Sequence, residues 1–258
     1  NVGKLVGPPI GGLLVAATGP AWALGIDATS YLLPIASVMF LLRPRRDQEQ
    51  RSAPGERASL SNAWQDCGST LRGVLSLTAV LCLVNFFHPG LAPLIAERVL
   101  GPSPQDLGLF TSVLAAGSIA GGVVLQRNSD RFCRRPFLTL GGFGLVTSIA
   151  QLGMARSPGV AFSLAMAFLI GAGTAGLLSS CNLITQIGSD PVMRGRMAGL
   201  SQIAFLGGGG LSGLLVAEVV VTSNLSTAFA LCGGISLVVA IRWILTRGKS
   251  TLEPIRSA

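Results

Sequence analysis

The chain places only a few side chains that could do chemistry inside its long apolar runs. His88 is the only histidine, and it stands between Asn85 and Pro89 in one such run. An imidazole there could take up and release a proton near neutral pH. Because a polar or charged group inside a membrane is costly, each one is a candidate for a substrate site or a proton path. These candidates are Lys4, Asp27, Asn85, His88, Asn182 and Gln202.

Each candidate also has an ordinary structural interpretation. Lys4 could extend to the membrane surface, and Asp27 could form a hydrogen bond to a neighbouring helix. No second histidine, metal-ligand spacing or nucleophile motif accompanies His88 in the sequence, so we expect no metal, no cofactor and no enzyme activity. The five cysteines show no paired framework, and three of them lie in apolar runs, where a lone cysteine is usually a small hydrophobic residue.

The composition indicates which elements must position these side chains. Half of the 258 residues are hydrophobic, only 12% are charged, and the mean hydropathy is +0.62. Soluble domains carry about 25% charged residues, and a run of roughly 20 apolar residues is long enough to cross a bilayer. The sequence therefore predicts an all-α, polytopic membrane protein.

Glycine, proline and charge divide the chain into about eight predicted spans. A polar linker over 43–72, with a short interfacial helix over 61–72, interrupts them, and a polar tail covers 248–258. Pro89 and Pro93 predict a kink in the third span. The predicted spans are 2–18, 21–42, 73–96, 106–125, 137–155, 160–187, 197–221 and 226–246.

Lysine and arginine alternate between the two sides of these spans. Sixteen fall on one side, in the linker, in the connections after the fourth and sixth predicted spans and at the far end of the chain, whereas only Arg98 and Arg156 fall on the other side. Since basic residues concentrate in cytoplasmic loops, this bias predicts that the linker and both ends of the chain are cytoplasmic. It also accounts for the net charge of +8 without a nucleic-acid partner.

Small residues in the first run predict close helix packing. Gly3, Gly7 and Gly11 recur every fourth residue, and Pro8 and Gly12 complete the pattern Gly-x-x-x-Gly-Pro-x-x-Gly-Gly. Such a face lets two membrane helices approach closely. A phosphate-binding loop would end in Gly-Lys-Ser/Thr, which this run lacks. The pattern resembles the helix-5 signature of drug and proton antiporters in the major facilitator superfamily.

An internal repeat extends this resemblance. The letters Gly-Leu-Leu-Val-Ala at 12–16 recur at 213–217, six predicted spans later. A parallel repeat of six spans is an arrangement found in facilitator-type transporters. On this interpretation residues 1–42 are the last two spans of the first half, about four spans are missing before them, and 73–247 is the second half.

Two connections carry further resemblance to the superfamily. One, which holds Asp130, Arg131, Arg134 and Arg135, resembles the loop motif whose charges latch the outward-facing state, although Gln126 stands where a glycine is usual. The second resembles a loop of the bacterial exporter branch that includes the enterobactin exporter. Its residues are Gln186, Pro191, Arg194, Gly195 and Arg196.

The resemblance implies a monomeric secondary transporter of the bacterial inner membrane. Such a protein exports a small molecule, a siderophore or an amphipathic drug, by alternating access with protons as the coupling ion. The alternative is a non-transporting receptor or assembly partner with the same fold, in which the polar residues of the kinked spans would face no continuous water-accessible cavity.

Overall fold

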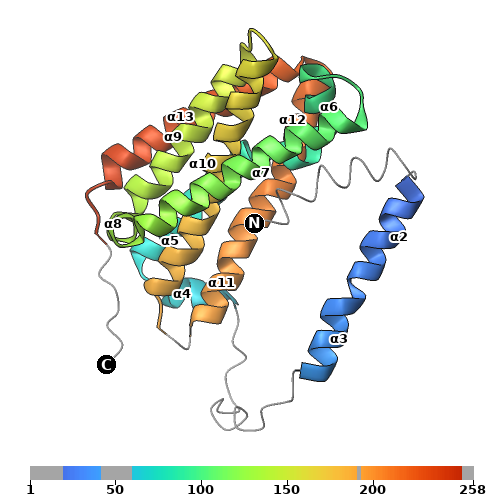
Figure 1. Cartoon of the computed structure of the whole chain (residues 1–258). Helices are drawn as coiled ribbons and strands as arrows, with labels where there is room; N and C mark the ends of the chain where they lie inside the picture. The colour runs from blue at the N-terminus through green and yellow to red at the C-terminus, as the bar shows by residue number, and fades with distance from the viewer. Residues whose placement is uncertain (1–19, 42–59, 191–192, 252–258) are drawn as a thin grey trace.

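The computed structural model describes residues 20–41, 60–190 and 193–251, and the regular elements in these ranges are helices (Figure 1). They are α2 Pro20–Ser30, α3 Leu32–Leu41, α4 Leu60–Asp66, α5 Ser69–Asn85, α6 His88–Val99, α7 Pro104–Arg127, α8 Ser129–Arg134, α9 Pro136–Ala155, α10 Val160–Ile187, α11 Arg194–Gln202, a π-helical turn Ile203–Gly207, α12 Gly208–Thr222 and α13 Leu225–Arg247. The predicted all-α class is confirmed.

Six helical segments within the described ranges are long and apolar enough to cross a membrane. They are Ser69–Val99, Pro104–Arg127, Pro136–Ala155, Val160–Ile187, Arg194–Thr222 and Leu225–Arg247. Each matches one of the last six predicted spans to within a few residues. The first predicted span, 2–18, lies outside the described residues. The second corresponds to α2 and α3, which meet at Tyr31 and lie apart from the bundle of six in Figure 1.

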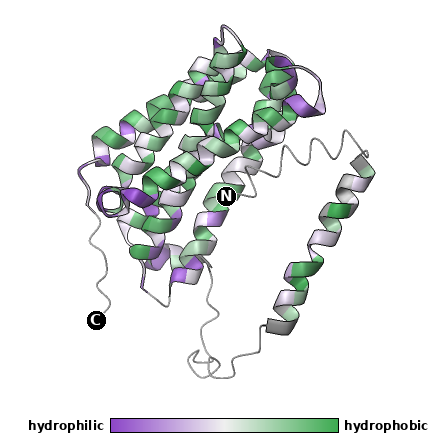
Figure 2. Ribbon diagram, in the orientation of Figure 1, coloured by the Kyte–Doolittle hydropathy of each residue, from purple (hydrophilic) through white to green (hydrophobic). Residues whose placement is uncertain are grey.

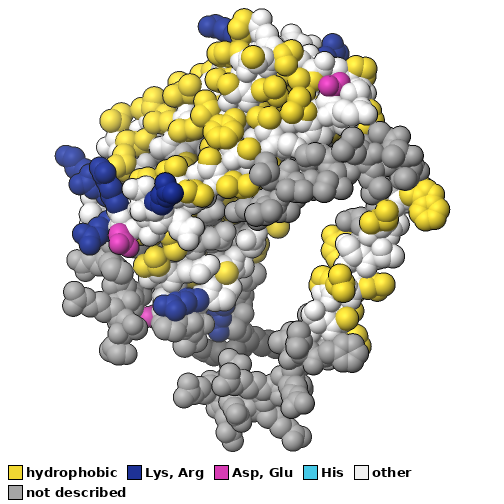
Figure 3. Space-filling model, in the orientation of Figure 1, with side chains coloured by type: hydrophobic (Ala, Val, Ile, Leu, Met, Phe, Trp, Pro, Cys, Tyr) yellow, Lys and Arg dark blue, Asp and Glu magenta, His cyan; other side chains and the backbone are white. Residues whose placement is uncertain are grey.

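The outside of the bundle is apolar, unlike that of a soluble domain. Apolar residues predominate along its helices (Figure 2), and apolar side chains cover the face of the bundle seen in Figure 3. Val221 and Leu245, for instance, are 82% and 79% exposed. Contiguous exposed apolar surface on this scale is typical of contact with lipid. Hydroxyl and amide side chains such as Thr78, Ser148 and Gln151 are instead fully buried between the helices. The chain is therefore a multi-pass membrane protein.

Glycines bring α7 and α10 into backbone contact. A Cβ atom placed on Gly117 would lie 1.9 Å from the carbonyl oxygen of Phe168, and one on Gly121 would lie 2.2 Å from that of Ala172. The contact is reciprocal, because a Cβ on Gly171 of α10 would lie 2.0 Å from the carbonyl oxygen of Leu114. Small residues spaced four apart thus allow the close packing that membrane helices use in place of a hydrophobic driving force.

The segment before the bundle differs from the prediction. We expected an interfacial helix over 61–72, but α4 ends at Asp66, and α5 already begins at Ser69. Gly68 separates the two helices. Cys67 and Leu71 on either side of it are buried in the same apolar cluster, so packing extends the membrane helix by a turn beyond the apolar run. The predicted division into 1–42, 43–72, 73–247 and 248–258 stays a prediction.

The two ends of the bundle carry different charge. We call the end that holds α4, α8, the start of α11 and the end of α13 the basic end (Figures 1 and 3). At this end, the Arg247 guanidinium lies 5.8 Å from the ring centre of Phe137 and 5.4 Å from that of Trp243. The end formed by the α6–α7, α9–α10 and α12–α13 connections is called the opposite end. The predicted alternation of charge between ends is therefore present among the described residues.

Candidate functional site

The first membrane span of the bundle is broken close to its middle. Helix α5 ends at Asn85, Phe86 and Phe87 are not helical, and α6 starts at His88. The break follows from Pro89, because proline has no N–H for the carbonyl of Asn85 four residues earlier and its ring clashes with that carbonyl. The predicted kink is thus confirmed, one turn earlier than the proline itself.

The break leaves backbone carbonyls that need other donors, because the last carbonyls of a helix have no partner within it. The side-chain amide of Gln151 on α9 supplies one. Its Nε2 atom lies 3.5 Å from the carbonyl oxygens of both Val84 and Asn85. Since Gln151 is fully buried, its amide replaces the water that would solvate these carbonyls in a soluble protein.

The Asn85 side chain connects the break to α9 and α13. Its Nδ2 atom donates to the Ser236 hydroxyl at 2.9 Å, and the Ser148 hydroxyl donates to the same oxygen at 2.7 Å. All three side chains are buried. Together with Gln151 and His88 they form a group that we call the break cluster: Asn85, His88, Ser148, Gln151 and Ser236.

His88 occupies the first position of α6 and is 8% exposed. Its Nδ1 atom lies 3.3 Å from the carbonyl oxygen of Asn85. A carbonyl oxygen can only accept, so in the neutral imidazole Nδ1 carries the hydrogen and Nε2 keeps its lone pair. The break therefore fixes the orientation and the tautomer of the one histidine of the chain, with Nε2 as the unprotonated nitrogen.

The break cluster has more acceptors than donors. Among the described residues, Asn85 Oδ1 and Gln151 Oε1 are buried without a hydrogen-bond partner. A buried acceptor without a donor costs about 1–3 kcal/mol, so native proteins rarely keep one without a reason. A site that combines unpaired oxygens with an imidazole is suited to bind a group that carries hydrogen-bond donors.

Aromatic side chains and a second irregular segment lie against the break. The Phe86 ring lies 5.3 Å from the His88 ring and 4.4 Å from that of Phe205, measured between centres. Phe205 belongs to the π-helical turn Ile203–Gly207. A Cβ on Gly209 would lie 2.5 Å from Phe86, so the glycine leaves room for this ring. Two irregular helical segments therefore meet beside the histidine, and π-helical turns are frequent at functional sites.

Of the predicted path residues that the structure describes, it brings Asn85 and His88 together. Asp27 lies in α2. Asn182 on α10 is half-buried and Gln202 on α11 is exposed, and neither side chain belongs to the break cluster. Lys4 lies outside the described residues, as does the predicted packing motif Gly3, Gly7, Pro8, Gly11 and Gly12. The roles predicted for all of these residues stay predictions.

The first predicted loop motif lies at the basic end, in and beside α8. Asp130 is exposed, and within the ranges that the structure describes it forms no ion pair with an arginine. Arg131, Arg134 and Arg135 instead line a cleft of about 530 Å³ with Phe132, Leu138 and Thr139. The latch that the motif implies in the superfamily therefore stays a prediction.

The second loop motif surrounds the start of α11, and its Pro191 lies outside the described residues. Gln186 is exposed in the last turn of α10, and Arg194 and Gly195 are exposed in the first turn of α11. Arg196 is half-buried, with its Nη1 atom 3.7 Å from the Met193 sulfur. These positions place the motif at the basic end beside α4, far from the break cluster.

Sequence reasoning missed Ser148, Gln151 and Ser236. Gln151 carried a usable signal, since it is the only amide in the apolar run 137–155 and stands three residues after Ser148, on the same helical face. Ser236 carried none, because serine is common in membrane helices. All five cysteines are buried and unpaired, and no group of metal-ligating side chains is found in the described part of the chain.

Six apolar spans around a buried polar cluster, one of them broken at that cluster, define a class of protein: a polytopic helical membrane protein built like a transporter. A family model described as transmembrane secretion effector matches residues 1–253. The chain belongs to this family of the major facilitator superfamily, so the resemblance to the superfamily is confirmed. The family consists of transporters, in line with the expectation that the chain is not an enzyme. No curated protein matches the chain.

Proposed function

We propose that the chain is a proton-coupled exporter that moves a siderophore or an amphipathic drug out of a bacterial cell by alternating access. Membership of the secretion effector family supports outward transport. The break cluster supports proton coupling and carries the proposal, because the break in the first span of the bundle orients the only histidine of the chain, and two buried oxygens of the same cluster have no partner among the described residues.

The proposed cycle uses the break as the place where a proton is bound. With His88 neutral, Nδ1–H donates to the Asn85 carbonyl and Nε2 accepts an incoming proton. The imidazolium then has two donors for a cluster that already has an excess of acceptors, so protonation changes the hydrogen bonds within the cluster, which join α6 to α5 and α5 to α9 and α13. Because α5 and α6 are separate helices, this change can move α6 without bending a continuous helix.

Uptake into inverted membrane vesicles tests the proposal. The protein is expressed at its full native length. A proton gradient, acidic inside, should drive accumulation of ethidium or enterobactin, and His88→Gln should abolish the gradient-dependent part. Ser112→Ala is the matched control, because within the described ranges the Ser112 hydroxyl bonds only to Gly108 of its own helix.

The two parts of the proposal fail differently. Gradient-dependent uptake that survives in His88→Gln would reject the role of the histidine while leaving export in place. No gradient-dependent flux of either compound would count against proton-driven export and favour a receptor or assembly partner of the same fold.

The proposal includes a location and an orientation. We place the chain in the inner membrane as a monomer, with the basic end in the cytoplasm, because basic residues favour that side. All native cysteines are buried, so a single introduced cysteine can be labelled from one side of intact cells. Ser157→Cys at the opposite end should react with an impermeant maleimide, and Asn128→Cys at the basic end should not.

A further inference from the structure

Arg98 and Arg156 depart from the charge pattern of the chain. Among the described residues, every other lysine and arginine lies at the basic end. Membrane proteins usually concentrate lysine and arginine at one end, so two arginines at the opposite end need an explanation. Both side chains line one cavity of about 810 Å³. Because both arginines line the same cavity, we infer that they act together.

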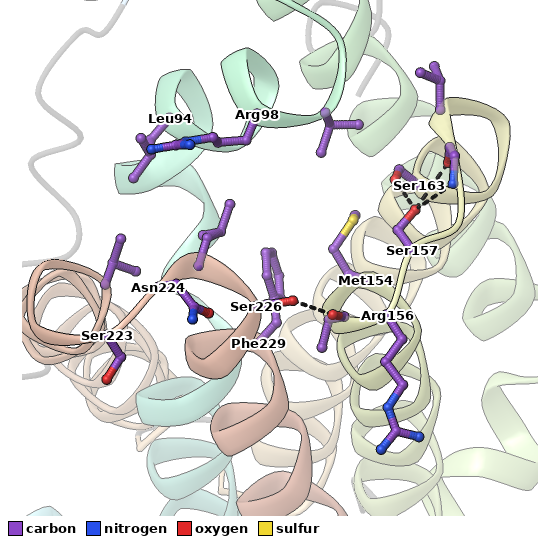
Figure 4. Close-up of a pocket in the computed structure, with 16 residues that line it drawn as sticks. Leu94, Arg98, Met154, Arg156, Ser157, Ser163, Ser223, Asn224, Ser226 and Phe229 are labelled. Atoms are coloured by element: carbon purple, nitrogen blue, oxygen red, sulfur yellow. Dashed lines mark hydrogen bonds between the residues drawn. The ribbon is translucent and has the colours of Figure 1, made fainter.

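The cavity opens at the opposite end, between the end of α6, the α9–α10 connection and the α12–α13 connection (Figure 4). Besides the arginines, its wall holds small polar groups, among them Ser157, Ser223 and Asn224. Figure 4 shows Arg98 lying across one side of the cavity and the Arg156 guanidinium turned outward at the rim. Arg156 is exposed, so its side chain can rotate toward a ligand within nanoseconds.

No carboxylate of the described residues lines this cavity. The acidic residues described at the opposite end are Glu97, Asp106 and Glu218, and none of them lines the cavity. The Asp106 carboxylate instead accepts hydrogen bonds from the hydroxyl and the backbone N–H of Ser103 at the start of α7. Helix α10 adds to the positive potential, because it begins at the cavity after Gly159, which provides no side-chain cap.

We propose that this cavity binds an oxyanion, a phosphate or carboxylate group, between Arg98 and Arg156. The planar guanidinium groups offer paired donors that fit such groups, and charge-assisted bonds of this kind are stronger than neutral ones. The same chemistry is presented by the headgroup of an anionic phospholipid and by a soluble acidic compound. The site is separate from the break cluster and does not depend on proton coupling.

The test uses the chain in nanodiscs and follows unfolding with a thiol-reactive dye, since all five cysteines are buried until the chain unfolds. One arm titrates inorganic phosphate into phosphatidylcholine discs, against potassium chloride of equal ionic strength. The second arm replaces part of the phosphatidylcholine with phosphatidylglycerol. We expect a higher unfolding midpoint in at least one arm. Arg98→Gln/Arg156→Gln should weaken the apparent affinity by at least about tenfold, as loss of charge-assisted bonds predicts.

Arg127→Gln/Arg242→Gln is the matched control, because it removes two exposed arginines and the same charge from the basic end. It should respond to anions as the unaltered chain does. Removing arginine from the opposite end strengthens the charge bias, so the test variant should insert correctly, and Arg98→Lys/Arg156→Lys should keep part of the affinity. A response to phosphate identifies a soluble anion, and a response to phosphatidylglycerol alone identifies a headgroup. No response in either arm, or equal responses of the test and control variants, would overturn the proposal.

Discussion

The α7–α10 contact gives the sharpest test of the packing, through the substitution Gly117→Ala. A Cβ at this position would stand 1.9 Å from the carbonyl oxygen of Phe168 and 2.8 Å from its carbonyl carbon. Ordinary contact begins at about 3.5 Å, so the two helices would have to separate locally by about 1.5 Å. Both clashing atoms belong to the backbone of a 28-residue helix, so no side-chain rotation can relieve the clash.

The expected cost follows from this geometry. Overpacking a well-packed interior costs about 1–3 kcal/mol, and we expect the upper part of that range because the clash meets backbone. In a segment of this size, 1 kcal/mol lowers the unfolding midpoint by about 2–4 °C. Gly117→Ala should therefore lower the midpoint by about 4–12 °C. Gly171→Ala, with its Cβ 2.0 Å from the Leu114 carbonyl oxygen, should behave alike.

Thermal unfolding in a mild detergent, followed with the thiol-reactive dye, measures this effect. Gly142→Ala on α9 is the control, because a Cβ there meets nothing within 4 Å. Alanine exceeds glycine in helix propensity by about 0.8–1.0 kcal/mol, so this control should be neutral or slightly more stable. If Gly117→Ala unfolds at or above the temperature of Gly142→Ala, the inferred backbone contact is wrong.

Three further predictions concern other contacts. Ser236→Ala removes the oxygen to which both Asn85 and Ser148 donate and should lower the free energy of unfolding by about 1–3 kcal/mol. Ser212→Ala is the control and should lower it less, because the buried Ser212 hydroxyl has no partner among the described residues. Equal unfolding midpoints of the two variants would contradict the break cluster. Burial, and secondarily the Asp130 carboxylate, raises the pKa of the Cys133 thiol above its ordinary value of 9.0. The folded chain thus holds this proton more tightly than the unfolded chain, so the stability it contributes is complete below pH 9 and is lost as the pH rises through the folded-state pKa. The midpoint should fall above pH 9, and less steeply in Cys133→Ser; identical slopes would refute the assignment. Arg247→Gln should lower the free energy of unfolding by about 0.5–1 kcal/mol, because the guanidinium loses its contacts with Phe137 and Trp243. It should also change Trp243 fluorescence. The same effects in Arg242→Gln would count against these contacts.

The sequence predicted the spans well because each depends on local composition. An apolar run bounded by proline, glycine or charge can be recognised without knowing its neighbours, and Pro89 marked the broken span. The start of α5 was predicted too late in the chain, because it depends on packing at Cys67 and Leu71, which a hydropathy pattern does not report. The π-helical turn at Ile203–Gly207 was also not predicted, since no residue type in Ile-Ala-Phe-Leu-Gly requires it.

The site was only partly predictable for a related reason. Asn85 and His88 could be selected as polar groups in an apolar run, but the residues on other helices that bond to Asn85 lie 66 or more positions away in sequence. Which face of α9 and α13 meets the break depends on how each helix is rotated about its axis. Since these helices are apolar on most sides, their sequence indicates the buried face less clearly than that of a soluble amphipathic helix does. The cavity at the opposite end likewise depends on three connections that only folding brings together.

The turn at Ile203–Gly207 has a consequence for how this helix tolerates changes in length. A π-helical turn accommodates one residue more than a regular helix, so the segment from Arg194 to Thr222 contains, in effect, one supernumerary residue. Deleting one residue within 203–207 should leave Gly208 and Gly209 on the face that receives Cys82 and Phe86, because the helix simply becomes regular. Deleting one residue from 195–201 instead rotates everything before the turn by about 100° relative to that face and should be far more damaging, which a comparison of yields of the two deletion variants from membranes would show.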